Sequence, residues 1–229
     1  ASEEDIENLC SAAIETGIVS RDDRSVVFHD LDLLRARIKD LIAIFPGNAL
    51  HAIAIKANPV IEVLKVSVEA GAGLEAASFE EVQIGLAAGC PPSRLVFDSP
   101  AKAIDELAEA LELGVMVNVD NFTELERIND LLAGRSPVNK IGLRINPVVG
   151  SGSIGITSVA DKSSKFGLRL DRDREAIIEA FRCFSWLTGL HVHIGSQGCD
   201  LDLLIAGVRR VQELRGAIEG ALGVGRIGF

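Results

Sequence analysis

The chain is poor in aromatic residues and in positive charge. Phe, Trp and Tyr make up 4% of its 229 residues, and tyrosine is absent altogether, so no tyrosine hydroxyl can serve in any site. The formal net charge is −10 at pH 7, which argues against nucleic acid and anionic membrane surfaces as partners. With 48% hydrophobic residues, the chain can nevertheless build one sizeable core.

Signals for membranes, secretion and disulfides are also lacking. No apolar run is long enough to cross a bilayer, and the acidic N-terminus lacks the basic and apolar parts of a signal peptide. The four cysteines lie far apart, at positions 10, 90, 183 and 199, without the close spacing of a metal knuckle. We therefore expect free thiols in a reducing compartment, the cytoplasm.

One lysine stands out against this background. Residues 51–59 read HAIAIKANP, so a short apolar run leads directly into Lys56 and is broken by Asn58-Pro59. Such a run is typical of a strand buried on both faces, with Lys56 at its carboxyl end. Lysine is rarely buried without a partner. Lys56 is therefore either a side chain that extends into solvent or a partly neutral, desolvated amine that can form a Schiff base.

Strand-like and helix-like segments alternate along the chain. A short strand is expected at residues 25–29, and apolar strands begin near residues 51, 73, 95, 115, 141, 188 and 226. Helices are expected at residues 5–17, 31–45 (with Asp30 as N-cap), 60–70, 79–88, 101–113, 123–132, 173–184 and 201–218. Glycine follows most of these helices. The alternation indicates parallel βαβ units.

Two architectures fit this pattern, an open doubly wound sheet and a closed (β/α)8 TIM-type barrel. The turn after the residue 51–56 strand has no glycine, unlike a dinucleotide-binding sheet. A barrel places polar residues at the carboxyl ends of successive strands. Here these residues are Lys56, Glu75, Asp98, Asn118, Asp120, Arg144, Asn146, His191 and His193. We expect an incomplete barrel of about seven strands over residues 31–229, after a leader of helix and strand over residues 1–30.

Two segments after the fifth strand carry further signals. Residues 148–167 are rich in Gly and Ser, and we expect a long loop that acts as a lid. Residues 189–198 read GLHVHIGSQG, which places His191 and His193 on one strand face and puts Gly195 and Ser196 where backbone amides and a hydroxyl can hold a phosphate. The two histidines also suggest a metal site, but no adjoining Cys, Asp or Glu cluster completes one. No metal is expected.

Three segments, in this order, resemble the motifs of the fold-type III pyridoxal-phosphate (PLP) decarboxylases, which have alanine-racemase-like barrels. They are residues 51–59, 164–168 (SKFGL) and 191–197 (HVHIGSQ). The family signature around the cofactor lysine is Tyr-Ala-any-Lys-Ala-Asn, and it stands here as IAIKAN. Members act on diaminopimelate, ornithine, arginine or carboxynorspermidine. The histidine motif looks most like that of the diaminopimelate decarboxylases, which make lysine.

The resemblance implies PLP as cofactor, a small amino acid as substrate, and a homodimer at full length. It also implies roles for individual residues. Lys56 would bind the cofactor covalently and then act as a proton shuttle. His193 would stack on the pyridine ring, and Gly195 and Ser196 would help to hold the phosphate.

Four more polar residues match the family in different ways. Arg144 would lie beside the 3′ oxygen of the cofactor, and Glu75 would face the cofactor lysine. Glu81 matches a family acid, but residues 78–81 read as a capping box, S-x-x-E, so we expect a structural role. His191 is expected to be a satisfied core histidine or one that supports its neighbours.

The chain departs from the family pattern at two places. Ile53 stands where the family has tyrosine. The family also continues past the position of Phe229 into a glycine-rich phosphate loop, a glutamate that pairs with the pyridinium nitrogen, the last barrel strand and a C-terminal β domain with a cysteine general acid. We therefore expect these 229 residues alone to be an inactive piece of a longer enzyme. A non-catalytic homologue and a Schiff-base aldolase without PLP are the alternatives.

Overall fold

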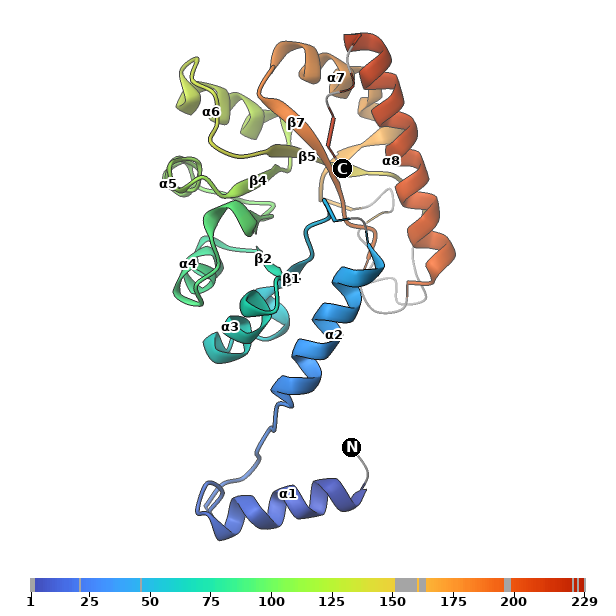
Figure 1. The fold of residues 1–229 in the computed structure, drawn as a ribbon. Helices are drawn as coiled ribbons and strands as arrows, with labels where there is room; N and C mark the ends of the chain where they lie inside the picture. Colours follow the sequence, from blue (N-terminus) through green and yellow to red (C-terminus); the bar gives the residue numbers. More distant parts are fainter. Residues whose placement is uncertain are drawn as a thin grey trace.

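The computed structural model describes residues 3–20, 22–45, 47–150, 160, 164–195, 199–223, 225, 227 and 228. Helices surround a parallel sheet (Figure 1). The strands are β1 (Ala52–Ala54), β2 (Gly73–Ala76), β3 (Leu95–Phe97), β4 (Met116–Val119), β5 (Ile141–Asn146), β6 (Leu168–Arg169) and β7 (Leu187–Val192). The helices are α1 (Glu3–Glu15), α2 (Leu31–Ile44), α3 (Ile61–Glu69), α4 (Phe79–Ala87), α5 (Ile104–Leu113), α6 (Phe122–Leu132), α7 (Leu170–Cys183) and α8 (Leu201–Leu222).

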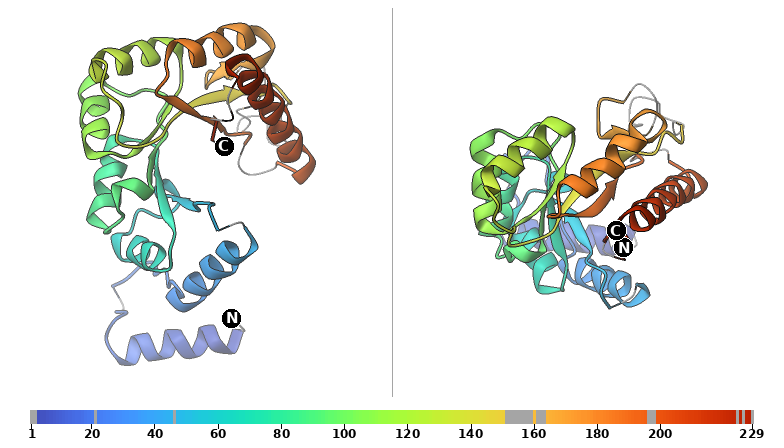
Figure 2. Two further views of the ribbon diagram at one scale, coloured as in Figure 1. Left: turned by 45° about the horizontal axis from the view of Figure 1, so that its top comes forward. Right: turned by 90° about the horizontal axis from the view of Figure 1, so that it is seen from above.

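The strands pair in the order in which they occur in the chain, as in a barrel. β1 to β5 are parallel neighbours, and β7 continues the sheet beyond β5. Ile145 pairs with both Leu168 and Val192, so the two-residue strand β6 lies on the opposite edge of β5 from β7. Gly228 forms a parallel bridge with Gly189 and begins the next strand position. The predicted α/β barrel arrangement is confirmed, as an arc of strands inside a ring of helices (Figure 2).

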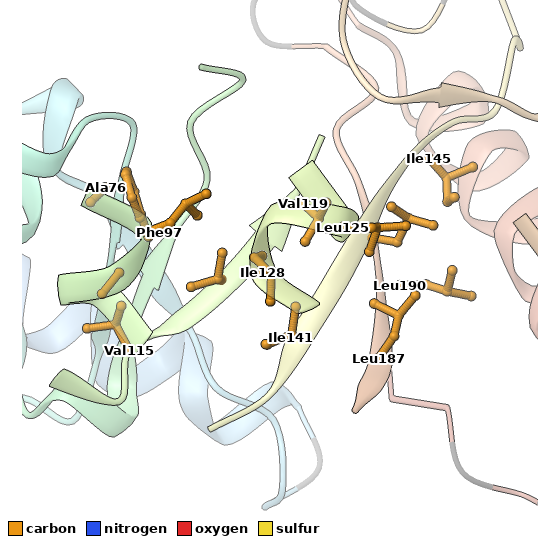
Figure 3. Packing of buried hydrophobic residues seen from close by; sticks show 14 of the residues in the cluster. Ala76, Phe97, Val115, Val119, Leu125, Ile128, Ile141, Ile145, Leu187 and Leu190 are labelled. Atoms are coloured by element: carbon orange, nitrogen blue, oxygen red, sulfur yellow. The ribbon is translucent and has the colours of Figure 1, made fainter. Parts of the chain in front are cut away.

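The core lies between the strands and the helices that cover them. Phe97, Leu125, Ile128, Ile141 and Ile145 are at most 1% exposed and belong to one cluster that runs from β3 past α6 to β5 (Figure 3). Burial of such side chains stabilises the fold by roughly 1.5–3 kcal/mol each. The inner side of the sheet is less tightly filled. A cavity of about 490 Å³ there is lined by polar side chains such as Glu75 and Asp98, by apolar ones such as Met116, and by the backbone of Gly142 and Gly189.

Helix starts follow the predicted capping chemistry. Asp30 accepts a hydrogen bond from the Leu33 N–H at 2.8 Å, and Ser78 accepts one from the Glu81 N–H at 3.3 Å. Gly114, which follows α5, has a left-handed φ of 75°, as a helix-ending glycine requires. α7 begins at Leu170, three residues before the predicted start, because Asp173 is a first-turn acid that accepts from the Arg169 N–H.

Several predicted elements differ in the structure. Residues 25–29 form no strand, and Val27 is 76% exposed, because no described strand lies beside this segment to complete a hydrogen-bonded ladder. β1 is only half-buried, and Lys56 lies in the 3₁₀ turn Ile55–Ala57 that follows it rather than in the strand itself. α8 extends to Leu222, and β6 was not predicted. Most of the expected 148–167 lid lies outside the described residues.

Candidate active site

Six of the polar residues predicted at strand ends take part in charged contacts at one rim of the sheet, whereas Asn118 lies in the cavity near Gly142 and Asn146 accepts from the Val148 N–H at 3.0 Å. Charged contacts join groups from different strands: Lys56 with Glu75, Arg144 with Asp98 and Asp120, and His191 with Asp98. These contacts connect the carboxyl ends of β1, β2, β3, β4, β5 and β7. This convergence is what the barrel prediction required, because parallel strands end on the same side.

Lys56 is held in place by the backbone of its turn. Ile55, fully buried, anchors the turn, and the Asn58 N–H donates to the Ile55 carbonyl at 3.0 Å. The lysine side chain is 54% exposed, and its Nζ lies 3.8 Å from Oε2 of Glu75. Lys56 therefore presents a primary amine at the rim, next to a carboxyl group, rather than a fully desolvated one.

Glu75 has the environment of a carboxyl group that holds a proton more readily than usual. Burial raises the pKa of Glu75, and the charge of Asp98 adds to the rise, whereas Lys56 opposes it. Because its carboxylate faces the Lys56 amine, Glu75 is placed to exchange a proton with that amine.

Arg144 is the buried cation of the site. Its Nη1 lies 3.7 Å from Oδ1 of Asp120 and 3.9 Å from Oδ2 of Asp98. The Arg144 guanidinium carbon stacks 4.8 Å from the centre of the Phe166 ring, a cation–π contact. Gly167 packs so closely that a Cβ there would lie 2.9 Å from the Arg144 carbonyl oxygen. Segment 164–168 thus closes over Arg144.

His191 and Asp98 each retain a buried atom without a partner. His191 Nε2 lies 3.4 Å from Asp98 Oδ2, but His191 Nδ1 and Asp98 Oδ1 have no hydrogen-bond partner among the described residues. Burial lowers the pKa of His191 to about 4, although Asp98 opposes this, so the ring is neutral at neutral pH. Of the two expectations for His191, the satisfied core histidine is therefore wrong, and the histidine that supports its neighbours stays a prediction.

His193 lies just past β7 and is half-buried. Burial lowers the pKa of His193, and the positive charges of Arg144 and Lys56 lower it further. An uncharged ring in this position can pack against a flat ligand. Gly195 is half-buried two residues later, whereas the predicted phosphate residue Ser196 lies outside the described residues.

Glu81 serves the start of α4. Its Oε2 accepts a hydrogen bond from the Ala77 N–H at 2.7 Å, while its own N–H donates to Ser78. This is a capping arrangement shifted by one residue from the usual one, in which the acid returns to the N-cap N–H. Both contacts belong to the helix terminus.

Sequence reasoning missed a buried ion pair behind the rim. Lys102 Nζ donates to both carboxylate oxygens of Glu124, at 2.9 and 3.0 Å, and to the Ser99 carbonyl at 2.6 Å. Residues 121–124 read N-x-x-E, a capping signature that could have drawn attention to Glu124. No local signal marks Lys102 as its partner. In the described part of the chain, no group of three or more His, Cys, Asp or Glu side chains could hold a metal ion.

Comparison with known proteins now identifies the family. Residues 31–226 match the family model described as "Pyridoxal-dependent decarboxylase, pyridoxal binding domain". The chain belongs to this family. Its cofactor is PLP.

The similar proteins named in these comparisons are mainly diaminopimelate decarboxylases. The one from Bacteroides thetaiotaomicron is 34% identical over 197 residues, which is 84% of this chain and 51% of that protein. The crystal structure of the Helicobacter pylori enzyme complexed with L-lysine has a TM-score of 0.74 at 28% identity and covers 86% of this chain and 50% of that one. The chain thus spans about half the length of the curated relatives it matches.

A lysine/ornithine decarboxylase from Vibrio vulnificus, complexed with putrescine, covers 99% of this chain and 55% of its own with a TM-score of 0.75. Its sequence identity is 22%, so this likeness concerns the fold alone. None of the described helices is both long and apolar enough to span a membrane.

The side chains at the rim fit an anionic aldehyde cofactor. Lys56 offers an accessible primary amine beside Glu75, and Arg144 offers a buried positive charge. His191 Nδ1 and Asp98 Oδ1 are buried in this cluster without a hydrogen-bond partner among the described residues, so the polar groups here do not fully satisfy one another. The predicted cofactor residues within the described chain, Lys56, Glu75, Arg144, His193 and Gly195, all occur at this end of the strands.

Proposed function

We propose that the protein containing these residues decarboxylates an amino acid, in the first place meso-diaminopimelate, to form lysine. The observation that carries this proposal is the Lys56 amine at the rim, 3.8 Å from Glu75 and near enough to His193 for its positive charge to lower the pKa of that ring. The choice of substrate is supported by the 34% identity to a diaminopimelate decarboxylase. Ornithine, arginine and carboxynorspermidine are the competing substrates within the same family.

The proposed roles follow from the chemistry of each group. Bound PLP supplies an electron sink for the charge left when carbon dioxide departs. Lys56 attaches the cofactor and, once displaced by substrate, moves a proton through its Nζ, while Glu75 exchanges a proton with that amine. His193 packs against the cofactor ring.

Charge and phosphate contacts complete the proposed site. Arg144 supplies a positive charge on the 3′-oxygen side of the cofactor, and Gly195 and Ser196 contribute to the phosphate site.

We also propose a boundary between a leader (residues 1–30) and the barrel (residues 31–229), since the family match begins at residue 31. All four cysteines are free, which supports a cytoplasmic location, and the resemblance supports a homodimer at full length.

The test is carbon dioxide release by the full-length, PLP-loaded protein. The kcat/KM for diaminopimelate should be more than about tenfold higher than that for ornithine or arginine. A difference of this size is expected when buried polar groups recognise the distal end of a substrate. Lys56→Ala should abolish turnover. Lys65→Ala is the matched control, because Lys65 pairs with Glu62 within α3, outside the strand-end cluster, and its loss should leave activity unchanged. Faster turnover of ornithine or arginine would overturn the proposed substrate.

A further inference from the structure

We propose that Lys102 is a positioning residue that sets the place of Arg144 through Glu124 and Asp120. Lys102 is 3% exposed and Glu124 is 2% exposed, so the pair is fully removed from solvent. Replacing a buried ion pair by apolar residues of similar size is often neutral or stabilising. Stability alone therefore does not account for the Lys102–Glu124 pair. The other contacts of the two side chains indicate a further role.

The Lys102 end of the pair fixes the loop between β3 and α5. Its Nζ donates to the Ser99 carbonyl at 2.6 Å and lies 5.6 Å from the centre of the Phe97 ring at the end of β3. Lys102 therefore ties the chain just after Asp98, one of the two carboxylates beside Arg144, to helix α6.

The Glu124 end fixes the next loop. Glu124 Oε2 accepts a hydrogen bond from the Asp120 N–H at 2.7 Å, and Asn121 Oδ1 accepts from the Glu124 N–H at 3.0 Å. The backbone of Asp120 is thus held by a carboxylate that is itself fixed by Lys102.

Asp120 connects the Glu124 hydrogen bond to Arg144 in the site. Its Oδ1 lies 3.7 Å from Arg144 Nη1 and accepts a hydrogen bond from the Gly167 N–H at 3.1 Å, which places Phe166 against the guanidinium. Three loops are therefore joined by one series of contacts that ends on Arg144. The inference rests on the proposed function in one respect only, that Arg144 faces the cofactor.

The decisive variant is Lys102→Met/Glu124→Leu in the full-length protein, which removes both charges and leaves neither unpaired. Two signals are measured: the Nε–H resonance of Arg144 in the cofactor-free protein and the Kd for PLP. Arg144 is the one buried arginine of the described residues, so its Nε–H is protected from exchange with water. We expect a broadened or shifted Arg144 resonance and a Kd raised about tenfold, the effect of one lost hydrogen bond. The thermal midpoint should fall modestly, because the Asp120 N–H loses its acceptor and the Ser99 carbonyl loses its donor.

Leu125→Val is the matched control, because Leu125 is fully buried next to Glu124 but takes no part in the series of contacts. If the double variant does not fold, Glu124→Gln is measured in the same way, because the amide removes the negative charge that pairs with Lys102 and replaces one accepting oxygen with an NH2 group that cannot accept from Lys102 Nζ. An unchanged Arg144 resonance, or an equal change in Leu125→Val, would overturn the proposal. A changed resonance with an unchanged Kd would support the positioning role and instead overturn the proposed contact between Arg144 and the cofactor.

Discussion

At the scale of single residues, His191 makes stability depend on pH. Its pKa is lowered to about 4 in the folded protein, against an ordinary value of 6.5, chiefly by burial. Between pH 4 and pH 6.5, His191 therefore binds a proton in the unfolded chain but not in the folded one. The contribution of His191 to the free energy of unfolding is fully present above pH 6.5 and is lost as the pH falls toward 4. Because of this one group, we expect the free energy of unfolding to fall by about 2 kcal/mol from pH 7 to pH 5.

Urea unfolding of wild type and His191→Gln at pH 7 and pH 5 checks this expectation. The variant should lose less stability on acidification than wild type does. His29→Gln serves as the control, because His29 is exposed and lies outside the strand-end cluster. If wild type and His191→Gln lose stability in parallel, the proton balance assigned to His191 is wrong.

The shape of the His193 ring, rather than its charge, is expected to determine its contribution to cofactor binding. An uncharged imidazole that packs against a cofactor contributes contact area, which a phenyl ring also supplies. We therefore expect His193→Phe to keep part of the affinity for PLP and His193→Ala to lose several-fold more. The measurement is the Kd for PLP of both variants. Equal losses would instead indicate a hydrogen-bonding or acid–base role for His193.

At the scale of elements, the start of α4 depends on Glu81. Because Glu81 accepts from the Ala77 N–H at 2.7 Å, Glu81→Ala should destabilise the protein by about 1 kcal/mol, the usual cost of a lost helix cap. Glu81→Gln keeps an oxygen that can accept the same hydrogen bond. It should retain stability and kcat, as measured by denaturant unfolding and steady-state assay. A Glu81→Gln variant that is stable but inactive would show that Glu81 has a chemical role.

Elements also show which features a sequence can predict. Lys56, Asp30 and Ser78 were found because apolar runs, turn residues and capping patterns are local in the chain. The contacts of Lys102 with Glu124 and of Arg144 with Phe166 join residues 22 positions apart or more. No local pattern specifies such pairs, since they arise only when successive strands bring their loops to one rim. The strand predicted at residues 25–29 was wrong for a related reason, because β-propensity does not supply the neighbouring strand that a strand needs.

At the scale of the whole molecule, the parallel order of the strands creates the site. Polar groups of the site lie in or just past β1, β2, β3, β4, β5 and β7, while the outer face of the sheet packs against helices to form the core (Figures 2 and 3). The arrangement separates stability from chemistry, because most of the buried apolar side chains lie away from the rim that carries Lys56, Glu75 and Arg144. Substitutions at this rim can therefore change function without unfolding the barrel.

Lys56 is the amine that we propose binds PLP in this barrel. The most direct measurement is borohydride reduction of the full-length, PLP-loaded protein, followed by digestion and mass spectrometry, because reduction converts a lysine–cofactor link into a stable amine. We expect one pyridoxyl-modified peptide, the one that contains Lys56. Modification of another lysine, such as Lys65 or Lys140, or the absence of any pyridoxyl label, would contradict it.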